Sequence, residues 1–140
     1  RGLGDVYKRQ QLVREFLAAV RQATPGICLK IIIESGELGT CQQISKATEL
    51  VVESGADFVK TSTGKVKVGV TEEAARIILA VIAASERPVG FKASGGVRSV
   101  EFALKLVSLF EELTGEVATA QLMRLGASAL LNDLSQQLDY

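Results

Sequence analysis

Hydrophobic positions along the chain switch repeatedly between a helical period and a strand-like period. The stretch QLVREFLAAVRQA at residues 11–23 repeats apolar residues every three or four positions and stops before Pro25 and Gly26, which predicts an amphipathic helix. Short apolar runs predict strands, which we place at residues 27–34, 56–60, 87–92 and 124–128. Amphipathic stretches predict further helices at residues 40–54 and 71–85, after residue 99 up to about 113, at 116–123, and up to about 138.

Strands that alternate with helices in this way form a parallel sheet built from right-handed βαβ units. Lys30, Lys60 and Lys92 each lie in or at the end of an expected strand, and they are 30 and 32 residues apart, which is about one strand and one helix. Under the two-residue alternation of a strand, Lys30 shares one side with Ile32 and Glu34. The same alternation allows all three lysines to point to one side of the sheet.

A charged side chain at the carboxyl end of a buried parallel strand fits a (β/α)8 barrel, where these ends form the mouth of the active site. A whole barrel takes roughly 250 residues and eight strands. The 140 residues of this chain supply four strands, so the expected fold class is α/β, in the (β/α)8 TIM-barrel family, with about the last four βα units present as a half barrel. We assign residues 11–140 to this half barrel. Residues 1–10 show no clear continuity with the helical pattern, and we interpret them as a non-native or truncated end.

Composition limits the classes of function. Acidic and basic side chains number 16 each, so the chain offers no positive field for binding nucleic acid or an anionic membrane. No apolar run approaches the roughly 18 residues of a membrane-spanning helix. Cys28 and Cys41 form no C-x-x-C pair and favour a reducing compartment, so we expect a cytoplasmic protein.

The chain has no histidine, which excludes Ser-His-Asp and Cys-His catalysis and histidine metal sites. Two nucleotide-binding motifs are also excluded. GLGDVY has Tyr7 where a dinucleotide loop needs its third glycine, and TSTGK has Val59 in place of the upstream P-loop glycine. We interpret three carboxylates near the strand ends as structural or surface groups: Glu34, Glu37 and Asp57. Any chemistry must therefore use lysine, carboxylate or hydroxyl groups.

Four segments resemble, in order and spacing, the C-terminal half of the deoxyribose-phosphate aldolases, a family of class I aldolases with a (β/α)8 fold. They are LKIIIESGEL, GADFVKTSTGK, VGFKASGGVR and RLGAS. KTSTGK followed about thirty residues later by GFKxxGGVR is a specific combination, whereas each motif alone is weak. The resemblance covers about residues 11–135.

The resemblance implies roles for the three lysines. Lys60, the first lysine of KTSTGK, matches the residue that forms the carbinolamine and imine with substrate, Lys92 matches the second lysine beside it, and Lys30 matches a third lysine linked to a proton relay. A free lysine has a pKa near 10.4, so nucleophilic amine is scarce at neutral pH. Bringing the nucleophile to about pKa 7 takes roughly three units, or about 4 kcal/mol, from a nearby ammonium group and from desolvation.

Glycine turns beyond the strands expose backbone N–H groups, which bind anions without a full positive charge. The resemblance assigns binding of the substrate phosphate to these turns, at Gly64, Lys65, Gly95, Gly96, Val97, Gly126 and Ser128. Ala129 stands where some family members have a second serine, so any effect of this departure is expected to weaken phosphate binding.

The implied reaction is the reversible cleavage of 2-deoxy-D-ribose 5-phosphate to D-glyceraldehyde 3-phosphate and acetaldehyde, with acetaldehyde held as an imine or enamine on Lys60. A protonated imine is the electron sink, so we expect no cofactor and no metal, and the partner is a small-molecule sugar phosphate. The proton-transfer aspartate of the family lies on the strand before the first one present here, outside this chain. Tyr140 is the candidate for the family's mobile C-terminal tyrosine, on a short tail.

Two alternatives remain open. A non-catalytic sugar-phosphate-binding or scaffolding half barrel would keep the turns without turnover, but the presence of both Lys60 and Lys92 favours the aldolase. A different Schiff-base aldolase on the same fold is the weaker alternative, because such relatives can share one strand-end lysine without the paired motif. An isolated half barrel has two unpaired edge strands and an uncovered sheet face, so we expect aggregation, self-association as a homo-oligomer, or dependence on the missing half.

Overall fold

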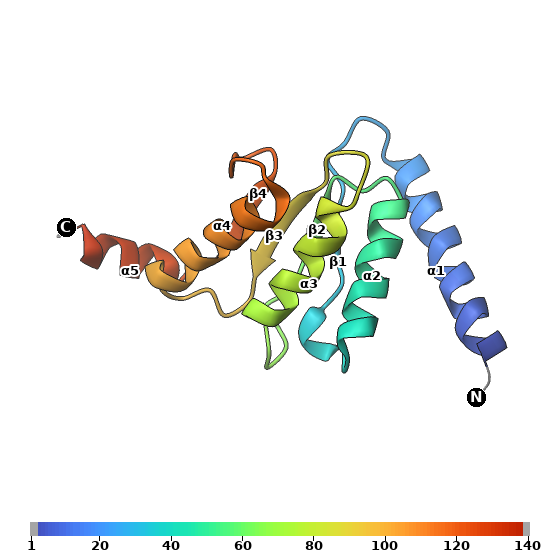
Figure 1. Cartoon of the computed structure of the whole chain (residues 1–140), viewed down its shortest axis with the longest axis horizontal. Coiled ribbons are helices and arrows are strands. Elements are labelled where there is room, and N and C mark those ends of the chain that lie inside the picture. Colours follow the sequence, from blue (N-terminus) through green and yellow to red (C-terminus); the bar gives the residue numbers. More distant parts are fainter. Residues whose placement is uncertain (1–2, 139–140) are drawn as a thin grey trace.

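The computed structural model describes residues 3–138 and contains one sheet of four parallel strands in the order β1-β2-β3-β4 (Figure 1). The strands are β1 (Lys30–Ile32), β2 (Phe58–Lys60), β3 (Gly90–Ser94) and β4 (Met123–Gly126). The helices are α1 (Leu3–Ala23), the 3-10 helix η1 (Ser35–Glu37), α2 (Cys41–Glu53), α3 (Glu72–Ala83), α4 (Val100–Thr114) and α5 (Leu130–Gln137). Each strand pairs in parallel with the next strand along the chain, which confirms the expected α/β fold class.

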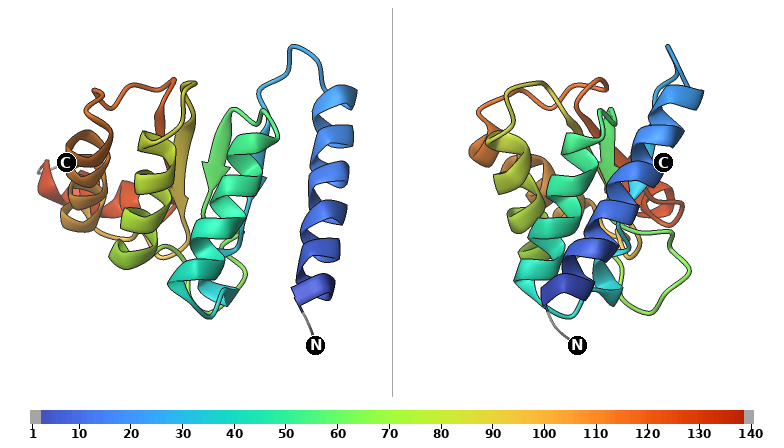
Figure 2. Two further views of the ribbon diagram at one scale, coloured as in Figure 1. Left: turned by 45° about the vertical axis from the view of Figure 1, so that its right-hand side comes forward. Right: turned by 90° about the vertical axis from the view of Figure 1, so that its right-hand side faces the viewer.

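Helices α2, α3 and α4 form a layer on one face of the sheet (Figure 2). Strand residues that point toward this layer, such as Val59 and Phe91, have no solvent exposure. The start of each helix is fixed by a side-chain oxygen that accepts a hydrogen bond from the backbone N–H three residues later. These N-cap residues are Thr40, Thr71 and Ser99. The helical layer and the sheet together enclose the hydrophobic core.

The opposite face of the sheet is not covered by any of the helices α1 to α4. We call it the cationic face, after the basic side chains that it presents from all four strands: Lys30, Lys60, Lys92 and Arg124. Phe58 lies among them, and Ile32 on the same side of β1 remains 39% exposed. In a closed barrel this face would point inward, which agrees with the expected half barrel.

Helix α1 begins at Leu3, so the expectation that the first ten residues have no continuity with the helical pattern is wrong for residues 3–10. No proline interrupts the segment, and Asp5 lies in the first turn, where a carboxylate favours the helix dipole. Leu17 is buried, whereas Leu12 and Phe16 are 64% and 66% exposed. Whether residues 1–10 belong to the natural protein stays a prediction.

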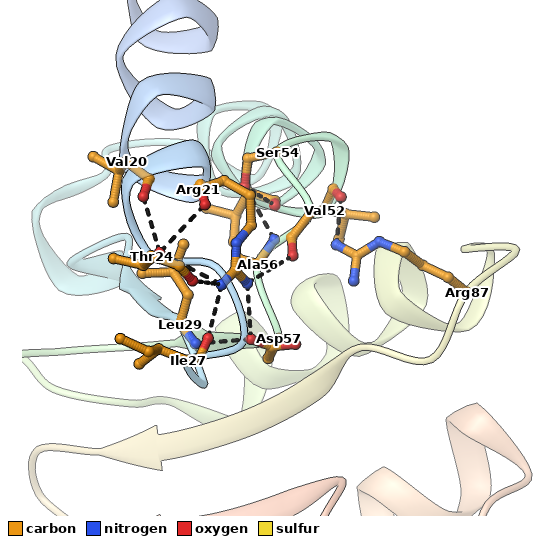
Figure 3. Close-up of polar contacts among 12 residues, drawn as sticks. Val20, Arg21, Thr24, Ile27, Leu29, Val52, Ser54, Ala56, Asp57 and Arg87 are labelled. Atoms are coloured by element: carbon orange, nitrogen blue, oxygen red, sulfur yellow. Dashed lines mark hydrogen bonds and ion pairs between the residues drawn. The ribbon is translucent and has the colours of Figure 1, made fainter.

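The carboxyl end of α1 is tied to the sheet through Arg21 (Figure 3). Its guanidinium donates to the carboxylate of Asp57 at 3.0 Å and to the carbonyl oxygen of Ile27 at 2.7 Å. The same carboxylate accepts a hydrogen bond from the backbone N–H of Leu29 at 2.8 Å. Asp57 thus joins the segments before β1 and β2, which confirms its interpretation as a structural carboxylate.

The segment between α4 and β4 differs from the expected helix at 116–123, which was wrong. Gly115 ends α4 in the left-handed conformation at φ 72°, and the N–H of Ala118 donates to the Glu111 carboxylate at 2.9 Å. The N–H of Met123 donates to the Thr119 carbonyl at 2.8 Å, which forms a single turn directly before β4. Eight residues form a marginal helix by themselves, and here these contacts with α4 replace it.

Candidate active site

The strand register brings the predicted nucleophile and its partner lysine together. Lys60 on β2 pairs with Lys92 on β3, and Lys92 pairs in turn with Arg124 on β4. Neighbouring strands lie about 4.8 Å apart, so side chains paired in this way and on the same face are close neighbours. Lys60 and Lys92 also line the same cleft. Two lysines that are 32 residues apart in sequence therefore share one site.

Lys30 lies deeper on the cationic face than the lysine pair. It is the first residue of β1 and pairs with Phe58, two positions before Lys60. Its Nζ is 5.8 Å from the centre of the Phe58 ring, and the Cζ of Arg124 is 4.6 Å from the same centre. Cations at such distances from an aromatic ring are attracted to it electrostatically. Phe58 therefore separates Lys30 from the cleft while holding it on the same face.

The charge on Lys92 is disfavoured in this environment. Partial burial is the main cause of its lowered pKa, and the positive charges of Lys60, Lys30 and Arg124 act in the same direction. These charges come from β2, β1 and β4. Arg98, in the turn that follows β3, is a further basic residue of the cleft, and no carboxylate lines the cleft among the residues that the structure describes. A neutral amine is therefore easier to form at Lys92 than at a solvated lysine.

A cleft of about 370 Å³ lies at the carboxyl ends of β2, β3 and β4. Besides the lysine pair it collects the predicted phosphate-binding residues Gly64, Gly95, Gly96, Val97, Gly126 and Ser128. Lys65 and Lys30 do not line the cleft, and Tyr140 lies outside the described residues. Most of the predicted site therefore forms one continuous surface.

The glycine turns of the cleft have the backbone features of an anion site. Gly95 and Gly96 follow β3 at φ values of 82° and 78°, which disfavour side chains. A side chain at Gly95 would also meet the backbone of Gly69. Among the described residues, the N–H groups of Gly64, Gly96 and Val97 have no acceptor in the protein. These donors are available to a bound anion.

A family model for DeoC/LacD aldolases matches residues 6–136, nearly the whole chain. The chain belongs to this family. The match also includes residues 6–10 of α1, which the motif comparison had left out.

Solved structures support the same assignment of fold. A Coccidioides immitis protein named as a deoxyribose-phosphate aldolase is 32% identical over 95% of this chain and 48% of its own, with a TM-score of 0.79. A Toxoplasma gondii protein with the same name is 22% identical over 97% of this chain and 54% of its own, with a TM-score of 0.85. The tetrameric deoxyribose phosphate aldolase of Aeropyrum pernix is 23% identical over 94% and 51%, with a TM-score of 0.69. This DeoC/LacD chain thus spans about half the length of the solved structures that it matches.

Sequence reasoning missed several residues of this DeoC/LacD site. Arg124 follows Lys92 by 32 residues, the interval that already separates Lys60 from Lys92, so the same repeat would have found it. Arg124 lies on the cationic face outside the lining of the cleft, whereas Thr63, Ser94, Arg98 and Ala127 line the cleft itself. Their positions beside predicted site residues were the available signal. The missed residues add mainly hydroxyl groups and positive charge to the site.

The described residues 3–138 contain neither a metal-ligand cluster nor a helix suited to a membrane. No group of three or more Cys, Asp or Glu residues is placed to hold a metal ion within that range. No helix in the described part of this DeoC/LacD chain is long and apolar enough to cross a bilayer.

Proposed function

We propose that this chain carries the imine-forming lysine and the phosphate site of an aldolase that cleaves 2-deoxy-D-ribose 5-phosphate reversibly. One observation carries the proposal: Lys60 and Lys92 are register partners in a cleft whose remaining walls are glycine turns with free N–H groups. A Schiff-base aldolase needs a nucleophilic amine, and a phosphorylated substrate needs donors for its phosphate. The cleft offers both within one surface.

Lys60 is the nucleophile in this proposal, and Lys92 is the acid-base group beside it. A lysine attacks a carbonyl only as the neutral amine. Burial and neighbouring positive charges lower the pKa of Lys92, so a larger share of it is neutral near pH 7 than of a solvated lysine. Its neutral amine can act as a general base that takes a proton from the adduct formed when the Lys60 amine attacks the carbonyl. The proton then passes from Lys92 to the hydroxyl group that leaves as the carbinolamine loses water, which restores the neutral amine. Lys30 and Arg124 contribute fixed positive charge from beneath.

The bond changes balance without a cofactor. The Lys60 amine adds to the C1 aldehyde of the open-chain sugar, and the carbinolamine loses one water to give the protonated imine. The C2–C3 bond then breaks: its electron pair moves toward the imine nitrogen to form an enamine, and the C3 hydroxyl gives up its proton as it becomes an aldehyde. Protonation of C2 and addition of one water release acetaldehyde and restore Lys60.

The phosphate is held by turns rather than by a cluster of basic side chains. Gly64, Gly96 and Val97 supply N–H donors, and the turn at Gly126 and Ser128 completes the wall of the cleft. Arg98 adds a positive charge at the same surface. Lys65 lies outside the lining, so we assign it long-range attraction rather than contact.

Several properties of the whole protein belong to this proposal. The sugar-phosphate substrate, the class I mechanism, cytoplasmic location and homo-oligomer formation all extend beyond the family assignment. The proton-transfer aspartate is expected on a strand that this chain does not include. A half barrel that binds sugar phosphate without turnover is the competing hypothesis.

Borohydride trapping tests the proposal directly. The chain is incubated with acetaldehyde or 2-deoxyribose 5-phosphate, reduced, and analysed by intact mass and peptide mapping. We expect a substrate-dependent adduct on Lys60 that is absent in Lys60→Ala and weakened about tenfold or more in Lys92→Ala, since general acid-base partners contribute roughly 10²–10⁴-fold to rate.

The matched control for trapping is Lys67→Ala, because Lys67 is exposed and does not line the cleft. This variant should give the same Lys60 adduct as the unmodified chain. A folded sample that forms no adduct, or that is labelled equally on many lysines, would support the non-catalytic alternative.

A further inference from the structure

Glu34 has an unusual backbone conformation at the end of β1. Its φ of 51° and ψ of 58° make it the only non-glycine residue with positive φ in the described range 3–138. Left-handed backbone is unfavourable for a residue with a Cβ, and such residues concentrate at functional sites. The surroundings must therefore hold Glu34 in place.

Backbone hydrogen bonds on both sides of Glu34 provide this restraint. The N–H of Ile33 donates to the carbonyl of Lys60 at 3.0 Å, and the N–H of Ser35 donates to the carbonyl of Thr61 at 2.9 Å. In a regular parallel ladder, residues two apart bond to carbonyls that are also two apart. Here the acceptors are consecutive, so Glu34 is an extra residue on the β1 side. Such a bulge redirects a side chain.

The redirected side chain of Glu34 reaches the turn that follows Lys60. Its Oε1 accepts a hydrogen bond from the N–H of Thr63 at 3.1 Å, and its Oε2 accepts one from the Thr63 hydroxyl at 2.7 Å. The Thr63 Oγ1 in turn accepts a hydrogen bond from the N–H of Lys65 at 3.1 Å. The N–H groups of Thr63 and Lys65 are thus occupied within the protein.

One donor of this turn remains for a ligand. The N–H of Gly64 lies between the two occupied groups and has no acceptor among the described residues, and Gly64 lines the cleft. Glu34 itself does not line the cleft. Its carboxylate therefore orders the turn from behind, without contact to a molecule in the cleft.

The neighbouring turn is packed as well as hydrogen-bonded. Gly36 lies so close to the backbone carbonyl of Val68 that a Cβ there would collide with it. The segment after β1 and the loop after β2 are therefore joined at two points, by the Glu34 carboxylate and by the contact at Gly36. These two contacts lie on either side of the Gly64–Lys65 part of the loop.

We propose that Glu34 is a positioning residue of the phosphate site, which holds the Thr63–Gly64–Lys65 turn so that the Gly64 N–H faces the cleft. The inference rests on the proposed function for the identity of the anion, a phosphate group. It does not depend on imine formation. An acidic side chain thereby strengthens the binding of an anion, because the two hydrogen bonds that its carboxylate accepts from Thr63 hold the turn in place.

Inorganic phosphate is the probe for the test. The 15N-labelled chain is titrated with phosphate, and the dissociation constant is read from the amide signals of Thr63, Gly64 and Lys65. We expect Glu34→Gln and Glu34→Gly to raise the dissociation constant about tenfold, since a charge-assisted hydrogen bond is worth that order of magnitude. Glycine suits the backbone at position 34, so this variant keeps the fold if the glutamine variant does not.

Glu37→Gln is the matched control, because Glu37 is an exposed carboxylate three residues away in η1. It should leave the dissociation constant unchanged. Three results overturn the inference: equal affinity in the Glu34 variants, tighter binding in them, as a purely electrostatic role would give, or no response of the Thr63–Lys65 amides in the unmodified chain.

A parallel measurement separates this inference from the proposed function. The unmodified chain is reduced with borohydride in the presence of acetaldehyde, which has no phosphate. Phosphate binding that depends on Glu34, without an adduct on Lys60, would refute the proposed chemistry and leave the positioning role in place. An adduct on Lys60 together with phosphate binding that does not depend on Glu34 would refute the positioning role and leave the proposed chemistry in place.

Discussion

Phe58 occupies the space beside Gly90 on the neighbouring strand, where any other residue would place a side chain. An added Cβ at Gly90 would lie 2.6 Å from the Cδ1 of Phe58, well inside van der Waals contact. The ring is almost completely buried and lies below the lysine pair, with Lys30 and Arg124 around it. The glycine therefore allows an aromatic ring to form the floor of the cationic face.

Gly90→Ala should destabilise the fold by about 1–3 kcal/mol, because overpacking in a filled interior displaces neighbouring side chains. Urea denaturation followed by circular dichroism would measure this change. Gly39→Ala is the control, since a Cβ there would meet only the Gln43 side chain at an ordinary 3.5 Å. Equal stability of the two variants would show that Phe58 can move aside without cost.

Lys92 makes the stability of the fold depend on pH. The sign of this dependence follows from its lowered pKa, for which burial is the first cause. The folded chain releases this proton at lower pH than the unfolded chain does. Near neutral pH the charged Lys92 therefore destabilises the fold, and the cost disappears as pH rises from the folded pKa toward the ordinary value of about 10.4. Lys92→Met should be more stable than the unmodified chain at pH 7, with a difference that shrinks on the alkaline side.

Denaturant unfolding of Lys92→Met across pH 7 to 10 would test this sign. Lys105→Met is the control, because Lys105 is an exposed residue of α4 that pairs with Glu72. A Lys92 variant that is less stable at pH 7, or a difference that does not vary with pH, would contradict the prediction.

Asp57 makes stability depend on pH in the acid range, and there its charged form stabilises the fold. The hydrogen bond from the Leu29 N–H, opposed in part by burial and reinforced by Arg21, lowers the pKa of its carboxyl group. Its contribution to stability is present above the ordinary value of about 3.9 and is lost as pH falls through the folded pKa. Asp57→Ala should cost about 1 kcal/mol near pH 7, mainly because the Leu29 N–H loses its partner.

Acid unfolding curves would compare Asp57→Ala with Glu53→Gln. Glu53 forms an exposed pair with Arg14, so its loss should change stability by less than about 0.5 kcal/mol. The cost at Asp57 should fall toward zero below its folded pKa. A cost that persists at low pH would show that the side chain acts by packing instead.

The cationic face could be predicted from sequence because it depends on a repeat. Parallel strands separated by helices of similar length bring residues about 30 positions apart into register, which placed Lys60 beside Lys92. The same spacing leads from Lys92 to Arg124, which the sequence analysis did not assign to the site although it is the first residue of the RLGAS segment. Strand alternation then determined which side chains shared a face. These features need only local periodicity and the geometry of the sheet.

Features that depend on contacts between loops could not be predicted in this way. The bulge at Glu34 exists because Thr63 offers two donors to its carboxylate, and nothing in the apolar pattern marks that pairing. The 116–123 segment has helical periodicity, but its Ala118 N–H donates a hydrogen bond to the Glu111 carboxylate instead of to a helical carbonyl. Helix α1 was placed too late because few of its first residues are apolar and buried.

The unpaired surfaces of the chain lead to a prediction about its state in solution. Within residues 3–138, strands β1 and β4 each have one edge without a partner strand, and helix α1 exposes Leu12 and Phe16. Open sheet edges and apolar patches favour association. The cationic face opposes the direct stacking of two copies through that face, because it would bring together the Lys30, Lys60, Lys92 and Arg124 side chains of both copies. We therefore expect concentration-dependent association through the strand edges or α1.

Size-exclusion chromatography with light scattering would measure the mass across concentrations, and Leu12→Lys with Phe16→Lys should shift it toward the monomer if α1 is the contact. A monomer at every concentration, with cooperative unfolding, would show that the open edges are tolerated and would refute the prediction.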